Sequence, residues 1–287
     1  MSGAGGEAAG LYDREAGLLA RMQDVVAQEP RPLLFATVSG AHLYGFPSQD
    51  SDVDLRGVHL LPIEDLVGLR RGELTAARTW WRDGLEIDLV THEVGKFARL
   101  LLRPNGYVLE QLLSPLVVSS SPLHEELAAA AEHLVTTGHA RHYLGFAATQ
   151  RRLFARTGQL KPLLYTFRTL LTGTHLMRTG RMLAHLPALA ELHRAPDYLS
   201  TLIEAKAAGE HRLLADLVDA PKPDRLAVDI LRLEDGLLSA AASCALPTGH
   251  EAHPVVEDIV IRARSAPGRL FTLSDMSVPE VVREQSD

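Results

Sequence analysis

Hydrophobic and polar positions follow two different periods along this chain. Residues 33–38 (LLFATV) form a short apolar run that predicts a buried strand, and residues 53–60 (VDLRGVHL) alternate as a half-buried strand does. The stretch between them, residues 39–51, is rich in Gly, Ser and Pro, which predicts a loop. Two more strands are expected within residues 77–90, on either side of a turn at Asp83-Gly84.

Helical periodicity follows these strands. Thr91 is expected to cap a helix that runs to about Leu101, and Pro104-Asn105-Gly106 should separate it from a second helix at 107–113. The period is then helical from about residue 123 to 246, with one further helix expected at 254–265. The last residues are polar and are expected to fray.

The order of these elements predicts an α+β protein, in which a short mixed β-sheet flanked by helices precedes an all-helical domain. We divide the chain into an N-terminal tail and helix (1–29), a catalytic domain with the strands (30–121), a helical domain (122–246) and a C-terminal segment (247–287). A length of 287 residues suffices for one large domain or two modest ones.

Composition narrows the class of protein. A single cysteine, Cys244, excludes an internal disulfide and argues against a cysteine-based zinc site, which fits a reducing cytoplasm. Thirteen histidines show no HExxH spacing. No apolar run approaches the roughly 20 residues that span a bilayer, and the first ten residues do not have the pattern of a signal peptide. We therefore expect a cytoplasmic protein without a membrane partner; its oligomeric state stays open.

The candidate chemistry is a group of carboxylates that follows a glycine. Ser39-Gly40-Ala41 comes directly after the first strand, and Asp52 and Asp54 open the second. Residues i and i+2 of a strand share a face, so the two carboxylates should point the same way and attract a hard divalent cation such as Mg²⁺. Asp88 would join them if its hairpin strand lies beside residues 53–60, and three carboxylates can hold two ions for a phosphoryl displacement.

A D-x-D pair alone is most often a solvated strand face, so the order of the surrounding elements matters. The sequence SGAHLYG, then SDVDLRGV, then DLVTHEVGKFARLLLRPNGYVLEQLLSP, then KPLLYTFRTLL resembles the DNA polymerase β superfamily of nucleotidyltransferases. The resemblance is closest to nucleotidyltransferases associated with RNA-repair operons, and it covers roughly residues 33 to 178. It implies a nucleotidyltransferase fold.

The resemblance also implies roles for individual residues. Asp52 and Asp54 would bind two Mg²⁺ ions (Mn²⁺ being an alternative), and Asp88 would ligate one metal and help activate the acceptor hydroxyl. Gly40 and its neighbours would hold the triphosphate. The chain departs from the family pattern at Ala41, where a serine or glycine usually follows the glycine; the side-chain donor would then be either lost or supplied by Ser39.

The positive charge is concentrated in one acid-free segment. Between Glu132 and Glu191 the chain has no Asp or Glu, although the average composition predicts about seven, and it has eight Lys or Arg. This segment therefore carries a formal charge of +8. The rest of the chain carries −15, and together they give the net charge of −7. The split predicts a positive face on the helical domain, opposite the carboxylates, with an NTP between them.

Within this segment Lys161, Tyr165 and Arg168 recur on one face of a helix. We expect Lys161 and Arg168 to meet the β and γ phosphates, with Tyr165 stacking or hydrogen bonding nearby; the family has a matching K, Y and R on a helix. The alternative is a solvated basic face, as for the other six cations, which are Arg141, Arg151, Arg152, Arg156, Arg178 and Arg181.

Several further residues are candidates with open alternatives. Arg56 shares the strand face of the D-x-D pair and could reach the substrate or form an ion pair with a carboxylate. His42 and Tyr44 follow Gly40 and are expected near the phosphates. Glu110 could orient the site. Trp80 and Trp81 could offer a platform for a base, although a hairpin tryptophan more often belongs to the core.

The reading that combines these features is transfer of a nucleoside monophosphate from an NTP, with ATP expected, to an acceptor hydroxyl, with release of pyrophosphate. The acceptor could be an RNA end, a small molecule or a protein side chain. A catalytically silent relative that binds nucleotide or RNA is the rival of a different class. Retention of all three aspartates opposes that rival, and Ala41 favours it slightly.

Overall fold

The computed structural model describes residues 10–69, 72–249 and 251–265, and the expected fraying of the last residues lies outside these ranges. Within them, five strands form one sheet in the order β3-β4-β2-β1-β5. The strands are β1 (Leu33–Val38), β2 (Val53–His59), β3 (Thr75–Arg82), β4 (Leu85–Glu93) and β5 (Val117–Ser119).

Parallel and antiparallel pairs make the sheet mixed, as the sequence predicts. β2 runs parallel to β4, and the other three neighbouring pairs are antiparallel. β3 and β4 are joined by a two-residue turn at Asp83-Gly84, where both residues have positive φ (49° and 76°), as such turns require. The four expected strands are confirmed, and β5 is an edge strand that the sequence did not predict.

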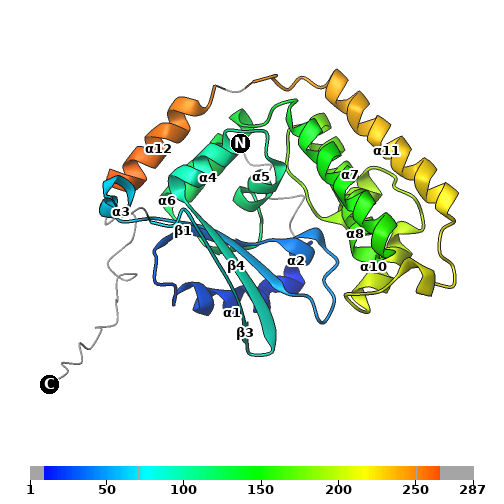
Figure 1. Ribbon diagram of the computed structural model, residues 1–287. Helices are drawn as coiled ribbons and strands as arrows, with labels where there is room; N and C mark the ends of the chain where they lie inside the picture. Colours follow the sequence, from blue (N-terminus) through cyan, green and yellow to red (C-terminus); the bar gives the residue numbers. More distant parts are fainter. Residues whose placement is uncertain (1–9, 70–71, 250, 266–287) are drawn as a thin grey trace.

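Helices cover both faces of this sheet (Figure 1). α1 (Ala16–Val26) lies against one face, and α4 (Val94–Leu101), α5 (Gly106–Leu112) and α6 (Pro122–Ala129) lie on the other. Two short helices, α2 (Gly40–Tyr44) and α3 (Ile63–Val67), follow β1 and β2. α2 corrects the expectation of a loop over 39–51, because a single helical turn fits between two glycines with positive φ, Gly40 and Gly45.

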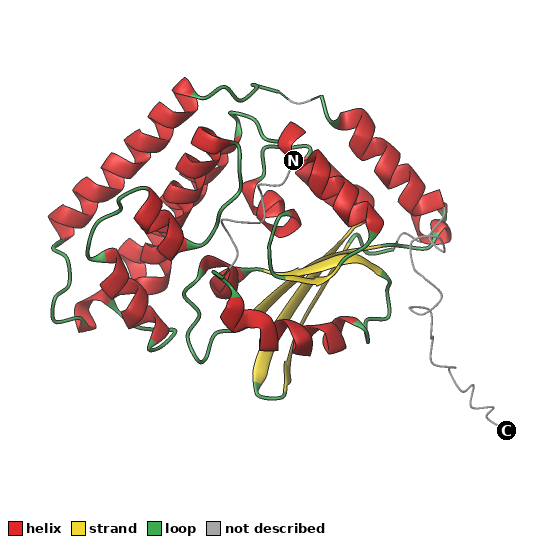
Figure 2. Cartoon of the chain, turned by 180° about the vertical axis from the view of Figure 1, so that it is seen from behind, coloured by secondary structure: helices red, strands yellow, loops and turns green. Residues whose placement is uncertain are grey.

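The remaining helices form a separate layer beside the sheet (Figure 2). α8 (Leu160–Thr179) lies at the centre of this layer and is buried on almost every side, with Leu163, Leu164 and Phe167 fully inaccessible. The predicted division into domains at 121 stays a prediction, since buried side chains of the sheet and of α8 belong to one continuous core. The helices of this layer are α7 (His139–Thr157), α8 (Leu160–Thr179), α9 (Leu186–Leu192), α10 (Leu199–Ala207) and α11 (Pro223–Ser243).

The end of β4 is fixed by the last described helix, α12 (His253–Ser265), which packs on α4 and α6. Thr91 is not the expected helix cap: it lies within β4, and the cap is Glu93, whose carboxylate accepts from the Lys96 N–H at 3.1 Å. Glu93 is fully buried, and Arg264 from α12 donates to its Oε1 at 2.7 Å. None of the helices in the described residues is long and apolar enough to cross a bilayer.

A buried ion pair joins the two layers. Arg168 of α8 and Glu110 of α5 are each about 1% exposed, and Arg168 Nη1 lies 2.6 Å from Glu110 Oε1. The hydroxyls of Tyr44 and Tyr143 also donate to Glu110, at 3.2 and 3.1 Å. Since a buried charge without a partner is strongly unfavourable, this pair sets how α8 sits against the sheet.

Replacing Glu110 by glutamine should therefore lower the free energy of unfolding by about 3–5 kcal/mol, because Arg168 would keep its charge in the interior without a counter-charge. Urea unfolding measures this. Glu126→Gln is the matched control, since Glu126 pairs with Arg262 at the surface; that change should cost less than about 1 kcal/mol. Equal losses in the two variants would contradict the role given to the buried pair.

Candidate active site

Asp54 and Asp88 are brought side by side by the parallel pairing of β2 and β4. They lie directly opposite each other in the register, which confirms the expectation that the Asp88 strand lies beside residues 53–60. Ile87 and Leu89 point to the other face and are buried, also as expected. Asp52 comes immediately before β2. The sheet therefore places Asp54 beside Asp88, and Asp52 lies near enough for its charge to raise the pKa of Asp54.

Arg56 occupies the position between two of these carboxylates. Its Nη2 donates to Asp54 Oδ1 and, at 3.0 Å, to Asp88 Oδ2. Its Nη1 donates to the Asp88 carbonyl at 2.7 Å, and its Nε donates to the Tyr107 hydroxyl at 3.0 Å. Of the two alternatives that the sequence left for Arg56, the structure shows the ion pair with the carboxylates.

One guanidinium does not neutralise this cluster. Burial raises the pKa of Asp54; Arg56 lowers it, but the negative charges of Asp52 and Asp88 raise it further, and the balance is a raised pKa. Protonation of Asp54 is thus favoured relative to a free carboxyl, first because the group is buried and then because charge of the same sign lies around it. A further cation at this point would relieve the same repulsion.

Thr79 completes the contacts of Asp88, and the sequence analysis did not identify it. Its Oγ1 donates to Asp88 Oδ1 at 3.0 Å, from the position opposite Asp88 on β3. Counting outward from a two-residue turn at Asp83-Gly84 places Thr79 opposite Asp88, so this partner could have been found from the sequence. No comparable pattern identifies Tyr107 as the partner of Arg56, because Tyr107 belongs to α5 and not to the hairpin.

Gly40 packs directly on the Asp54 carboxylate. The Ser39 N–H donates to the Asp54 carbonyl at 2.8 Å, so the chain enters α2 beside this residue. A Cβ at Gly40 would lie 1.8 Å from Asp54 Oδ2, and the φ of Gly40 is +64°. The Ser39 hydroxyl is fully buried and has no hydrogen-bond partner among the described residues. A free hydroxyl and a bare backbone therefore lie next to the carboxylate.

Lys161, at the start of α8, carries positive charge toward the same cluster. Its ammonium lies 2.5 Å from Glu210 Oε1. Burial lowers its pKa, but the hydrogen bond to Glu210 and the charges of Glu210, Asp52 and Asp54 raise it by more. Lys161 is thus kept protonated near Asp52 and Asp54, and its contact with the β and γ phosphates stays a prediction.

A second lysine fastens the loop that leads into Asp52. Lys206 is fully buried, and its ammonium donates to Ser48 Oγ and Ser51 Oγ, both at 3.0 Å, and to Glu210 Oε2 at 2.5 Å. The two lysines lower the pKa of Glu210 to about 2, against the opposite effect of burial. Sequence reasoning missed Lys206 and Glu210, because their i, i+4 spacing is also that of an ordinary surface pair.

Tyr165 lies beside the cluster, in an aromatic group rather than in an open cleft. Its ring meets the rings of Tyr44 and Phe46 edge to face, with centroids 5.3 and 5.8 Å apart. Burial raises the pKa of its hydroxyl, and the charges of Asp54 and Asp52 raise it further. Tyr165 is therefore a neutral group close to both aspartates.

Three other predicted substrate contacts are corrected by the structure. Arg168 is enclosed in the core, where it pairs with Glu110 and stacks 4.0 Å above the Tyr44 ring, so its charge is used internally. Tyr44 is buried beneath it. His42 points to the N-terminal segment, with Nδ1 2.9 Å from Glu15 Oε2. These side chains shape the surroundings of the site and are not placed to touch phosphates.

The positive charge of the acid-free segment is partly neutralised by acids from elsewhere in the chain. Lys161 pairs with Glu210, Arg168 with Glu110, and Arg151 with Glu234 at 3.1 Å. The segment is basic in the sequence because its counter-charges come from distant positions. The positive charge of the expected face is therefore weaker than the formal charge of +8 suggests.

The described residues contain no ready-made cluster of three or more His, Cys, Asp or Glu side chains with the arrangement of a metal site. Asp54 Oδ1 and Asp88 Oδ2 nevertheless converge on one cationic nitrogen, Nη2 of Arg56. Carboxylate oxygens that meet at one cation are the ligand type that Mg²⁺ requires. The residues present fit a divalent ion if the guanidinium of Arg56 moves aside.

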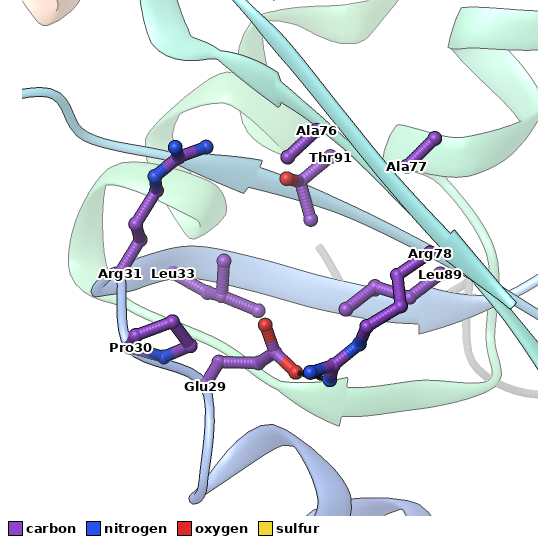
Figure 3. Close-up of a pocket in the computed structure, with 9 residues that line it drawn as sticks. All are labelled: Glu29, Pro30, Arg31, Leu33, Ala76, Ala77, Arg78, Leu89 and Thr91. Atoms are coloured by element: carbon purple, nitrogen blue, oxygen red, sulfur yellow. Dashed lines mark hydrogen bonds and ion pairs between the residues drawn. The ribbon is translucent and has the colours of Figure 1, made fainter. Parts of the chain in front are cut away.

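A pocket lies on the opposite face of the sheet (Figure 3). It is lined by Leu89 and Thr91, which alternate with Asp88 along β4, and Arg78 closes one side through an ion pair with Glu29. The pocket therefore does not open onto the carboxylates. The other residues that line it are Pro30, Arg31, Leu33, Ala76 and Ala77.

Paired strand aspartates beside a glycine turn are the features by which the sequence resembles nucleotidyltransferases of the DNA polymerase β type. Comparison with known families agrees, because residues 15–224 match the model described as RlaP, the RNA repair pathway DNA polymerase beta family. This match covers most of the chain, and the chain belongs to this family. The resemblance seen in the sequence is therefore confirmed.

Individual relatives add little detail. An uncharacterized protein of Methanocaldococcus jannaschii is 32% identical over 153 residues, which are 51% of this chain and 61% of that protein. Among solved structures, a nucleotidyltransferase-like protein from Exiguobacterium sibiricum aligns over 77% of this chain and 73% of its own, at 15% identity and a TM-score of 0.31. At that TM-score the structural likeness carries no argument.

The contact of Gly40 with Asp54 predicts a large effect of a small substitution. Gly40→Ala adds a methyl group inside the van der Waals radius of the carboxylate, in addition to about 1–2 kcal/mol of backbone strain at positive φ. Gly158→Ala is the control, because Gly158 has a φ of +67° and open space around it. Urea unfolding should show a clearly larger loss for Gly40→Ala, and equal losses would rule out the contact.

The Lys206–Glu210 pair predicts a stability difference that depends on pH. Glu210→Gln should lower the free energy of unfolding by about 3 kcal/mol at pH 7, since Lys206 stays buried without its counter-charge. The pKa of Glu210 is lowered from 4.5 to about 2 on folding, so its stabilisation is fully present above about pH 5 and is lost as the pH falls toward 2. The parent and the variant should therefore converge in acid.

The matched control for this measurement is Glu204→Gln, which removes an exposed acid from α10, the helix that carries Lys206 and ends before Glu210. Its effect should stay within about 0.5 kcal/mol at every pH. A difference between parent and Glu210→Gln that persists unchanged down to pH 2 would show that the carboxylate of Glu210 is not the source of the effect.

Proposed function

We propose that this protein transfers a nucleoside monophosphate from an NTP, with ATP expected, to the terminal hydroxyl of an RNA. The observation that carries the proposal is the convergence of Asp54 and Asp88 on one cation, beside the bare backbone of Gly40. Membership of a family described by RNA repair supports RNA as the acceptor class. A small molecule or a protein side chain is the alternative acceptor.

Asp52, Asp54 and Asp88 would hold the Mg²⁺ ions, which would neutralise charge that develops on the phosphoryl oxygens. The acceptor oxygen forms a bond to the α-phosphorus while the bond to the bridging oxygen breaks, and pyrophosphate leaves. Asp88 would take the proton of the acceptor hydroxyl, and the hydrogen bond from Thr79 to one of its oxygens supports this role.

On the other side of the carboxylates, the chain offers donors to the triphosphate. The Ser39 hydroxyl has no partner within the described residues, so it can replace the hydroxyl that Ala41 lacks. Lys161 supplies a positive charge near Asp52 and Asp54. Arg168 contributes only indirectly: it supports Tyr44, whose ring packs against Tyr165.

A silent nucleotide-binding module is the second candidate, and one observation favours it. Arg56 already forms ion pairs with both Asp54 and Asp88, so the carboxylates are satisfied without a metal ion. In this reading Lys161 and Ser39 would bind nucleotide while no transfer takes place. The two candidates differ in turnover and not in nucleotide binding.

Incubation of the protein with an α-labelled NTP, Mg²⁺ and RNA with free hydroxyl ends tests the proposal. Label should appear on RNA, and Asp54→Asn and Asp88→Asn should each reduce it by about a hundredfold or more, because several kcal/mol of charge stabilisation depend on these carboxylates. Glu64→Gln, an exposed acid on α3, should leave the rate unchanged.

Other outcomes separate the alternatives. Label on a protein or a small molecule when cell lysate replaces RNA would reassign the acceptor and keep the reaction. Binding of the NTP with no transfer to any of these acceptors would favour the silent module. Full activity of Asp54→Asn would overturn the metal assignment.

A further inference from the structure

Trp81 is an exposed aromatic side chain on the same sheet face as the carboxylates. It lies two residues beyond Thr79 on β3, and alternation along a strand places these two side chains on one face. Thr79 marks that face, because it donates to Asp88. Trp81 is 70% exposed, which is unusual for so large an apolar group.

The neighbouring tryptophan shows the contrast. Trp80 points to the opposite face, where it packs against the core and lies beneath Arg78, whose guanidinium is 4.0 Å from the ring centroid. Trp80 therefore packs against the core, which is the ordinary role of a hairpin tryptophan. Trp81 has no such packing role.

The distance between Trp81 and Asp88 is one that a single nucleoside can span. Trp81 lies opposite Glu86, which is two residues before Asp88 on β4. Such diagonal neighbours in an antiparallel pair are separated by about 7–8 Å. A nucleobase stacked on the Trp81 ring would therefore be close enough for a hydroxyl of its own ribose to approach Asp88.

The order of the strands assigns Trp81 to one of the two substrates. The triphosphate donors follow β1 or lie near Asp52, whereas Trp81 lies on β3, beyond Asp88 at the other side of the D-x-D pair. In an in-line displacement the attacking and leaving oxygens are on opposite sides of phosphorus. With pyrophosphate leaving on the β1 side, the acceptor enters from the side of β3.

We infer that Trp81 is the stacking platform for the terminal nucleobase of an RNA acceptor. This inference rests on the proposed function, and it adds the group that holds the acceptor. Stacking tolerates any base because each presents a flat π face, so Trp81 provides affinity without sequence preference. Glu86, the residue opposite Trp81 on β4, is acidic, which favours a contact with the base over one with the phosphate backbone.

The chain has two tryptophans, so the fluorescence of each can be isolated. In Trp80→Phe, Trp81 is the single reporter, and a short oligoribonucleotide with a free 3′-hydroxyl should quench it in the absence of NTP. In Trp81→Phe, the remaining Trp80 should respond little. ATP with Mg²⁺ and without RNA should leave the emission of Trp81 unchanged.

Affinity for the oligoribonucleotide, measured by anisotropy of a labelled strand, gives a second readout. Trp81→Ala should weaken binding about 5- to 150-fold, and Trp81→Phe should weaken it much less, because phenylalanine keeps a ring to stack on. In steady-state transfer assays Trp81→Ala should raise the KM for RNA and leave the KM for the NTP unchanged. Trp81 is exposed, so its removal should not unfold the protein.

The results distinguish the stacking role of Trp81 from the proposed transfer reaction. Unchanged RNA affinity in Trp81→Ala, or quenching of Trp81 by ATP in place of RNA, would overturn the inference even if the protein transfers nucleotides to RNA. Quenching and weakened binding as expected, together with no transfer in any assay, would keep the stacking site and overturn the proposed reaction. An oligodeoxyribonucleotide that binds as tightly as RNA would overturn the assignment to RNA specifically.

Discussion

The repulsion between Asp54 and Asp88 is the physical constraint on which the arrangement of the site depends. Parallel pairing of β2 and β4 places two carboxylates side by side, which is unfavourable unless positive charge lies between or beside them. Arg56 supplies that charge from within the same strand, and Lys161 supplies more from the helical layer. The strands, the turn at Gly40 and the start of α8 are therefore linked through one electrostatic balance, in which a substrate-bound metal ion would be a competitor of Arg56.

Much of this arrangement was predictable because it depends on local patterns. The patterns of hydrophobic and polar residues over 33–38, 53–60 and 77–90 predicted the strands. The turn at Asp83-Gly84 set the register that brings Thr79 to Asp88. The hairpin strand of Asp88 was expected beside β2, and it is. What could not be predicted depends on distant partners: Arg168 looked like a phosphate ligand until its place opposite Glu110, 58 positions away, was known. Thr91 looked like a cap because a strand that continues two residues further has no separate signal in the sequence.

The acid-free segment is a second case in which contacts with distant residues could not be predicted from the sequence. Its eight cations suggested a face for a polyanion, but Glu110, Glu210 and Glu234 reach it from three other parts of the chain. Charge along a sequence reports on neighbours in the chain, whereas the field at a site depends on neighbours in space. Lys206 illustrates this most clearly: its ammonium, fully buried, holds Ser48 and Ser51 in place before Asp52 and takes no part in any motif.

The ion pair between Glu93 and Arg264 has a practical consequence for work on isolated fragments. The match to the family ends at residue 224, and a fragment cut there would appear to contain every aspartate of the site. It would lack α12, and with it the cation that neutralises a fully buried carboxylate at the end of β4. The carboxylate of Glu93, which also caps α4, would then be left without its counter-charge, five residues from Asp88. The family boundary is thus a boundary of shared sequence, and the unit that folds around the site reaches further along the chain.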